Sequence, residues 1–161
     1  MVIEQQTLIA PPYQYIIDTC SILSQKTNEP HRRNVYSTLW DRIDQLVQKQ
    51  AIVTCSEIQE EVEDDNLQQW LARHLCVVLD IDDDIQQLVV HVVTEHPELI
   101  DFNNAKSSGD AFLIATAIKY GLSIITEENK TSPKRIPQIC KAYGICCYNI
   151  TELAEKECWQ F

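Results

Sequence analysis

The chain has 161 residues, 45% of them hydrophobic and 23% charged, a balance typical of one globular domain with a sizeable core. No apolar run approaches the roughly 20 residues that span a membrane, and the first residues lack the pattern of a secretory signal. We therefore expect a cytoplasmic protein without a membrane partner. The net charge of −11 argues against nonspecific coating of nucleic acid, so such contact must be local or assisted by metal ions.

Seven cysteines and four histidines show no spacing typical of a metal site. No Cys-x-x-Cys pair occurs, and His91 and His96 are five residues apart instead of the three or four that share a helical face. In the absence of a secretion signal, reduced structural thiols are expected. The three glycines leave no glycine-rich phosphate loop.

The predicted elements begin with a flexible arm over residues 1–12, followed by a single domain over residues 13–161. Residues 15–17 form a continuous apolar run, which is typical of a strand buried on both faces. A helix is predicted over residues 33–49, because an apolar residue recurs there every four positions and gives one buried face. These apolar residues are Val35, Leu39, Ile43 and Val47.

The middle of the chain repeats the order of strand and helix. Residues 51–55 predict a second strand, after which Ser56 can cap a very acidic helix. A polar helix around residues 67–74 leads to a third apolar run at 76–81. An amphipathic helix is then predicted over residues 82–95, with Pro97 just beyond its end.

The central unit of the chain is a strongly apolar helix that enters from a loop at residues 101–108. Ser107 or Ser108 can cap this helix, and Gly121 is expected to end it in the left-handed conformation. The remaining elements are a strand at 122–126, a helix from Pro133 or Pro137 to about Gly144, a strand at 145–150 and a short helix at 151–159. This alternation predicts an α/β sandwich with a mainly parallel sheet of about five strands.

Acidic side chains stand where several of these strands end. Asp18 directly follows the first strand, Glu127 and Glu128 follow the fourth, and Asp110 opens the helix that leads into the fourth. Sites in parallel sheets form outside the carboxyl ends of the strands, so these carboxylates are expected to converge there. Crowded carboxylates repel unless a cation holds them, and oxygen ligands suit Mg²⁺ or Mn²⁺. Two further candidates on the helix after the second strand are Glu60 and Glu61.

Each of these carboxylates also has an ordinary structural interpretation. Asp18 could cap a turn, and Asp110 could simply favour the positive end of a helix. Glu60 and Glu61 could belong to a solvated helix face. No single residue is specific, and only the joint placement indicates a site.

Three stretches resemble a known family. These are "YIIDTCSIL" from residue 15, "SEIQEEV" from residue 56, and "SSGDAFLIATAIKYGLSIITEEN" from residue 107. They look like the motif series of PIN-domain ribonucleases, including the VapC-type toxins of bacterial toxin–antitoxin pairs. The resemblance covers about residues 13–153, and the third stretch is its most specific part.

The resemblance implies a PIN-like three-layer α/β/α sandwich and a Mg²⁺- or Mn²⁺-dependent endoribonuclease that is the toxin of such a pair. It assigns catalytic and metal-binding roles to Asp18, Glu61, Asp110 and Glu128. The chain departs from the family pattern because Cys20 follows Thr19, and because glutamate replaces aspartate in the last motif. The additional positions are Glu60 and Glu127 as alternatives, and Ser21 and Thr126 as hydroxyls near the metal.

The partners that the resemblance implies are an RNA substrate and a small antitoxin protein, and a homodimer is a further expectation. Local basic residues are candidates for RNA contact, although each could equally be a solvated surface charge. They are Arg32, Arg33, Lys106, Lys130, Lys134 and Arg135.

Two other functions remain open at this point. The first is a catalytically weak PIN-like module that works by binding protein, which the acidic surface and the altered last motif would suit. The second is a phosphotransfer enzyme with Asp18 as nucleophile. It is disfavoured because "DTCS" lacks the second aspartate, two residues on, of haloacid-dehalogenase-like phosphatases.

Overall fold

The computed structural model describes residues 13–18, 32–57, 69, 72, 76–99, 108–127 and 136–161. The predicted arm at residues 1–12 lies outside these ranges. The elements are β1 (Tyr15–Ile17), α3 (Ser37–Gln48), β2 (Ile52–Cys55), β3 (Val77–Leu79), α6 (Asp83–Glu95), the short 3₁₀ helix η1 (Pro97–Leu99), α7 (Ser108–Tyr120), β4 (Ser123–Ile125), α8 (Ile136–Ala142), β5 (Cys147–Tyr148) and α9 (Ile150–Lys156).

The five strands form one parallel sheet in the order β3-β2-β1-β4-β5. β1, the first strand in the chain, is the central strand of the sheet, with β2 and β3 on one side and β4 and β5 on the other. Tyr15 pairs with Ile52 of β2 on one side, and Ile17 pairs with Ile125 of β4 on the other. The predicted parallel sheet of about five strands is confirmed.

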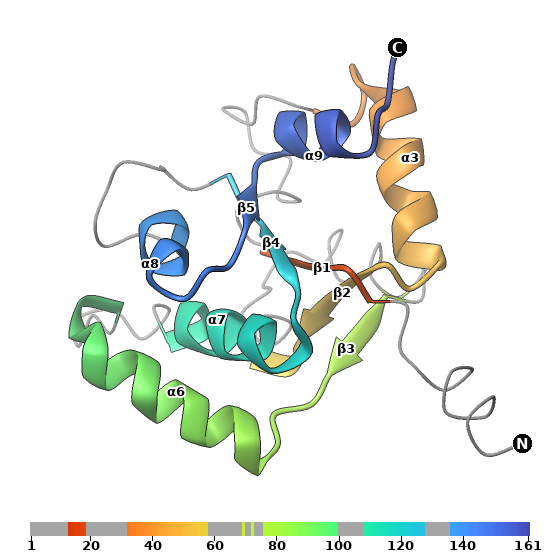
Figure 1. The fold of residues 1–161 in the computed structure, drawn as a ribbon. Coiled ribbons are helices and arrows are strands. Elements are labelled where there is room, and N and C mark those ends of the chain that lie inside the picture. Colours follow the sequence, from red (N-terminus) through yellow and green to blue (C-terminus); the bar gives the residue numbers. More distant parts are fainter. Residues whose placement is uncertain are drawn as a thin grey trace, which may run out of the picture.

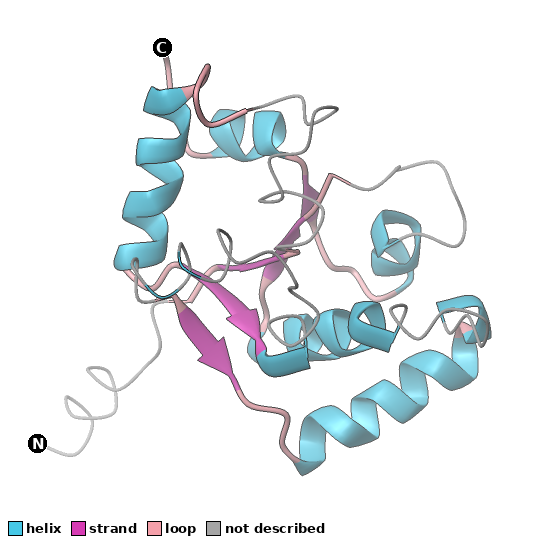
Figure 2. Cartoon of the chain, turned by 180° about the vertical axis from the view of Figure 1, so that it is seen from behind, coloured by secondary structure: helices cyan, strands magenta, loops and turns pink. Residues whose placement is uncertain are grey.

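The sheet separates two layers of helices (Figures 1 and 2). Side chains alternate between the two faces of a strand, and β1 shows this directly. Tyr15 and Ile17 join a buried cluster with α3 and α9, whereas Ile16 joins a second cluster with α6, α7 and α8. All three residues are almost completely buried. The architecture is therefore a three-layer α/β/α sandwich, as predicted.

The first predicted helix begins later than its sequence pattern indicates. α3 begins at Ser37, and Val35 lies in a turn before it with 69% of its surface exposed. The backbone carbonyl of Arg32 accepts the N–H groups of Val35 and Tyr36, which defines this turn. The prediction that Val35 belongs to the core face was wrong. The buried face consists of Leu39, Trp40, Ile43 and Val47.

The boundaries around α7 and α9 follow local chain chemistry. Gly121 has a φ of 65°, so the predicted left-handed end of α7 is confirmed. α9 begins at Ile150, slightly earlier than predicted, because Asn149 and Glu152 form a reciprocal capping box. The six cysteines of the described part are all free thiols. Within the same part, no helix has the length and apolar character needed to cross a membrane.

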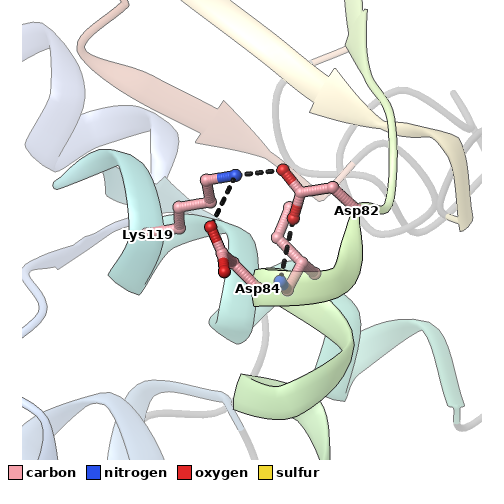
Figure 3. Close-up of polar contacts among 4 residues, drawn as sticks. Asp82, Asp84 and Lys119 are labelled. Atoms are coloured by element: carbon pink, nitrogen blue, oxygen red, sulfur yellow. Dashed lines mark hydrogen bonds and ion pairs between the residues drawn. The ribbon is translucent and has the colours of Figure 1, made fainter.

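An ion pair joins the beginning of α6 to the end of α7 (Figure 3). Asp82 caps α6 by accepting the N–H of Ile85 at 2.9 Å, and its second oxygen accepts a hydrogen bond from Lys119 of α7. Asp84 adds a carboxylate oxygen 3.6 Å from the Lys119 ammonium. The hydrogen bond from Lys119 and then that from Ile85 lower the pKa of the Asp82 carboxyl, and the contact with Asp82 raises the pKa of Lys119.

This contact makes the stability of the protein depend on pH in a defined direction. The folded-state pKa of Asp82 is below its unfolded value, so its contribution is present above the unfolded pKa and is lost as pH falls through the folded one. Asp82→Asn keeps an acceptor for the cap but removes the charge. We expect this variant to be less stable than wild type at neutral pH, with the difference shrinking below a pH of about 3.9.

Urea unfolding followed by circular dichroism at several pH values measures this difference. Asp83→Asn is the matched control, because it removes the same charge from the same helical turn without touching Lys119. A gap between wild type and Asp82→Asn that persists unchanged in acid would contradict the assignment.

Candidate active site

Asp18 is the most buried carboxylate that the structure describes, with 5% of its surface exposed. It directly follows β1, where its N–H donates to the carbonyl of Ile125 in β4 at 2.9 Å. Its Oδ2 accepts a hydrogen bond from Thr126 Oγ1, also at 2.9 Å. Thr126 is 2% exposed, so the pair is enclosed. A carboxylate is expensive to bury unless it is hydrogen-bonded, and Thr126 supplies one such bond.

The register of the sheet brings these two residues together. Ile17 lies opposite Ile125, so Asp18 and Thr126 are the next neighbours along the two strands, although 108 positions separate them in the chain. By alternation both side chains follow the face of Ile16 and Ile124, which is the face that α7 covers. The pair therefore lies between the sheet and α7.

The location of the pair coincides with the point where the strand order reverses. β2 and β3 lie on one side of β1, and β4 and β5 lie on the other. In open parallel sheets, the crevice beyond the carboxyl ends of the strands at such a point is where ligands bind. Asp18 and Thr126 stand at the ends of the two strands that meet there.

Asp110 approaches the same edge of the sheet from α7. This residue lies in the first turn of α7 and is partly exposed. α7 contacts β1 and β4 and passes through Gly121 directly into β4. It must therefore run against the direction of β4, which puts its first turn toward the carboxyl edge (Figure 1). The direction of α7 thus carries Asp110 toward the edge at which Asp18 stands.

Glu127 is directed to the other layer. Its Oε1 accepts the N–H of Ile150, the first residue of α9, at 2.9 Å. Thr126 follows the α7 face, so the alternation of an extended chain puts Glu127 on the opposite face. The carboxylate thus contributes to the N-terminus of α9. The sequence pattern did not reveal this role of Glu127. Asn149, the capping residue of α9, does mark the helix start that the Glu127 carboxylate contacts.

The remaining predicted site residues lie outside the described part of the chain. In the described ranges, no group of three or more His, Cys, Asp or Glu side chains is arranged to hold a metal ion. Two of the four assigned carboxylates, Asp18 and Asp110, fall within those ranges. The predicted residues outside them are Ser21, Glu60, Glu61, Lys106, Glu128, Lys130, Lys134 and Arg135.

A family model matches residues 15–161, which includes every element from β1 to α9. The chain belongs to the DUF4411 family, described as a domain of unknown function. The Asp18–Thr126 pair and Asp110 lie inside this DUF4411 domain. A comparison with curated proteins gives no match.

The two described candidates for RNA contact in this DUF4411 chain differ sharply. The guanidinium of Arg33 lies 4.4 Å from the centre of the Trp40 ring, and its Nη1 is 3.2 Å from Asp44 Oδ2. These contacts join the turn before α3 to α3 itself, and a structural role explains Arg33. The Nε of Arg32 is buried and has no hydrogen-bond partner. Within the described structure, the Arg32 Nε is one of three buried side-chain polar atoms without a hydrogen-bond partner, the others being Thr54 Oγ1 and Tyr143 Oη.

Thr126→Val tests the contact between Thr126 and Asp18, because valine keeps the shape of threonine and removes the hydroxyl. We expect the free energy of unfolding to fall by about 1–3 kcal/mol, the typical cost of removing one partner of a buried charged group. Thr126→Ser keeps the hydroxyl and should retain more of the hydrogen bond. Chemical denaturation of the metal-free protein measures both. Equal losses in the two variants would show that packing of the methyl group, and not the hydroxyl, is what matters.

Proposed function

We propose that this DUF4411 protein is a PIN-like endoribonuclease that depends on Mg²⁺ or Mn²⁺. The observation that carries the proposal is the buried Asp18 at the reversal point of the sheet, hydrogen-bonded to Thr126 and approached by the α7 turn that bears Asp110. The motifs around these residues support the assignment through their resemblance to PIN-domain ribonucleases.

The types of atom at this edge suit a hard cation. Carboxylate and hydroxyl oxygens are the ligands that Mg²⁺ and Mn²⁺ prefer. Asp18 and Asp110 would hold the ion together with Glu61 and Glu128. When bound, such an ion supplies an activated water and stabilises charge on the leaving oxygen of a phosphodiester. Asp18 is well suited to orient an ion, since Thr126 and the surrounding core hold its carboxylate in place.

The orientation of Glu127 supports Glu128 as the fourth carboxylate. Glu127 is directed toward α9, on the face of the sheet opposite to Asp18. If the chain continues in an extended conformation, the next side chain returns to the α7 face. Glu128 is then the member of this pair that would meet the ion.

The biological role that we propose is the toxin of a toxin–antitoxin pair, with a small antitoxin protein as partner. It rests on the resemblance of the motifs to VapC-type toxins. The genomic neighbourhood offers a direct check, because such a toxin is encoded beside a small DNA-binding protein. A gene that stands alone would count against the toxin role while leaving ribonuclease activity untouched.

Asp110→Asn separates a metal ligand from a residue that merely favours a helix start. Asparagine caps about as well as aspartate, and losing one charge at a helix N-terminus costs only about 0.3–1 kcal/mol. We expect an unchanged or higher melting temperature without metal and loss of the stabilisation that Mg²⁺ gives to wild type. We also expect cleavage of single-stranded RNA to fall by orders of magnitude.

Thermal melting with and without Mg²⁺, together with an RNA cleavage assay, gives both readouts. Asp84→Asn is the matched control, since Asp84 stands in the first turn of α6 with its side chain 75% exposed. This control should cleave RNA as wild type does. Full wild-type activity in excess chelator would refute the metal-dependent mechanism. Absence of Mg²⁺ or Mn²⁺ binding at millimolar concentration in calorimetry would instead favour the protein-binding module.

Glu127→Gln and Glu128→Gln distinguish the two glutamates. Glutamine at 127 can still accept the N–H of Ile150 through its amide oxygen, so we expect nearly normal cleavage and a small change in stability. Glutamine at 128 removes a charge from the proposed ion and should reduce cleavage by at least about tenfold, equivalent to about 1.4 kcal/mol. The same cleavage assay compares them. A larger loss from Glu127→Gln would reverse the assignment.

A further inference from the structure

We propose that Glu127 is a positioning residue of the candidate active site. Through its hydrogen bond with Ile150 it fixes the end of β4, and so it holds Thr126 against Asp18. Glu127 itself touches neither the metal ion nor the RNA in this proposal. The inference rests on the proposed ribonuclease function, because the carboxylate that it concerns is the one that would orient the ion.

Backbone hydrogen bonds join the end of β4 to the strands on both sides. The Asp18 N–H donates to the Ile125 carbonyl at 2.9 Å, and the Thr126 N–H donates to the Tyr148 carbonyl at 2.9 Å. Tyr148 is the last residue of β5, a strand of only two residues that leads directly toward α9 (Figure 1). The pairing of β4 with β5 therefore ends at Thr126, the residue whose hydroxyl contacts the buried carboxylate.

The Glu127 carboxylate continues this connection beyond the point where the backbone pairing ends. In a parallel ladder that continued, the N–H of Ile150 would donate to the Thr126 carbonyl. Ile150 instead begins α9 directly after Asn149, and its N–H donates to Glu127 Oε1 at 2.9 Å. Because Ile150 is completely buried, this bond ties the end of β4 to a fixed point of the interior.

α9 has its own signal to begin and does not depend on Glu127 for it. The Asn149 side chain accepts the N–H of Glu152 at 2.8 Å, and the Glu152 side chain accepts the N–H of Asn149 at 3.0 Å. This capping box is a local arrangement that satisfies two N–H groups of the helix start. The bond from Glu127 adds what the local cap does not supply, a link between α9 and β4. Its ionised acceptor makes that link stronger than a bond between two neutral groups.

The link reaches the Asp18 carboxylate through a single neighbour in the chain. Thr126 immediately precedes Glu127, and its Oγ1 donates to Asp18 Oδ2 at 2.9 Å. The end of β4 is thus held on both faces of the sheet, by the Thr126 side chain on the α7 face and by the Glu127 side chain on the α9 face. Partners that orient a metal ligand typically change metal affinity by about 10–100-fold. Glu127 lies one step farther from the ion, so we expect a smaller effect.

Amide hydrogen exchange of the metal-free protein, followed by NMR, measures directly how firmly the end of β4 is held. In Glu127→Ala we expect the Thr126 amide to exchange about tenfold faster relative to the amides of β2, because the loss of one charge-assisted hydrogen bond makes local opening easier. β2 lies on the other side of β1 and reports any global loss of stability. Glu127→Gln should exchange nearly as wild type does, since its amide oxygen can still accept the N–H of Ile150.

Calorimetric titration with Mg²⁺ and the RNA cleavage assay show whether this hold matters to the site. We expect Glu127→Ala to weaken Mg²⁺ binding by about threefold or more and to raise the Mg²⁺ concentration for half-maximal cleavage by the same factor. Glu127→Gln should match wild type in both measurements. Asn149→Ala is the matched control, because it removes the side-chain cap of α9 and leaves Glu127 and Ile150 in place. This control should lower the melting temperature without changing Mg²⁺ binding.

Three outcomes would overturn the positioning role while leaving the nuclease intact. They are wild-type Mg²⁺ binding by Glu127→Ala, equal losses of Mg²⁺ binding in Glu127→Ala and Asn149→Ala, and a loss in Glu127→Gln as large as that in Glu127→Ala. The second would show a general effect of α9, and the third would make the charge of Glu127 the important property, as for a metal ligand. A wild-type protein that neither binds Mg²⁺ or Mn²⁺ nor cleaves RNA would refute the proposed function itself. Unchanged exchange of the Thr126 amide in Glu127→Ala would refute the hold on β4 independently of any metal.

Discussion

The central position of β1 is the constraint on which the rest of the structure depends. This three-residue strand pairs with β2 on one side and β4 on the other, and its side chains are buried in both helical layers. Because β1 and β4 are adjacent and parallel, the residues that follow them must emerge side by side. The contact between Asp18 and Thr126 is a direct consequence of that pairing.

The two faces of the sheet divide the acidic residues into separate roles. Asp18 and Thr126 follow the face covered by α7, the helix whose first turn carries Asp110. Glu127, only one residue beyond Thr126, serves the N-terminus of α9 on the other face. A one-residue difference along an extended chain is enough to change the layer that a side chain enters. The same geometry that assembles a candidate site therefore also removes one carboxylate from it.

The arginines at the start of α3 show a similar division by packing. The Arg33 guanidinium lies over the Trp40 ring and pairs with Asp44. Both partners belong to α3, so the charge of Arg33 lies against that helix. Arg32 has no such neighbour within the described structure, and its buried Nε remains without a partner. Adjacent residues of the same type thus have different surroundings, since Arg33 lies against Asp44 and Trp40 whereas the Arg32 Nε is buried without a hydrogen-bond partner.

The amino-acid sequence by itself determined the order of elements and the class of the fold. Continuous apolar runs indicated the buried strands, the four-residue spacing indicated α3, and Gly121 indicated the end of α7, because each of these signals depends on neighbouring residues alone. Local signals failed where packing decided the outcome. Val35 fits the helical spacing but is exposed, while Trp40, which lies off that spacing, is buried.

Only the tertiary structure decided which side chains meet. The pairing of Asp18 with Thr126, the capping of α9 by Glu127 and the contact between Lys119 and Asp82 join residues that are far apart in the chain. Such contacts follow from strand register and from the direction in which each helix returns to the sheet. A sequence pattern can show that a carboxylate stands at the end of a strand, but the face it occupies and the partner it finds depend on how the layers pack.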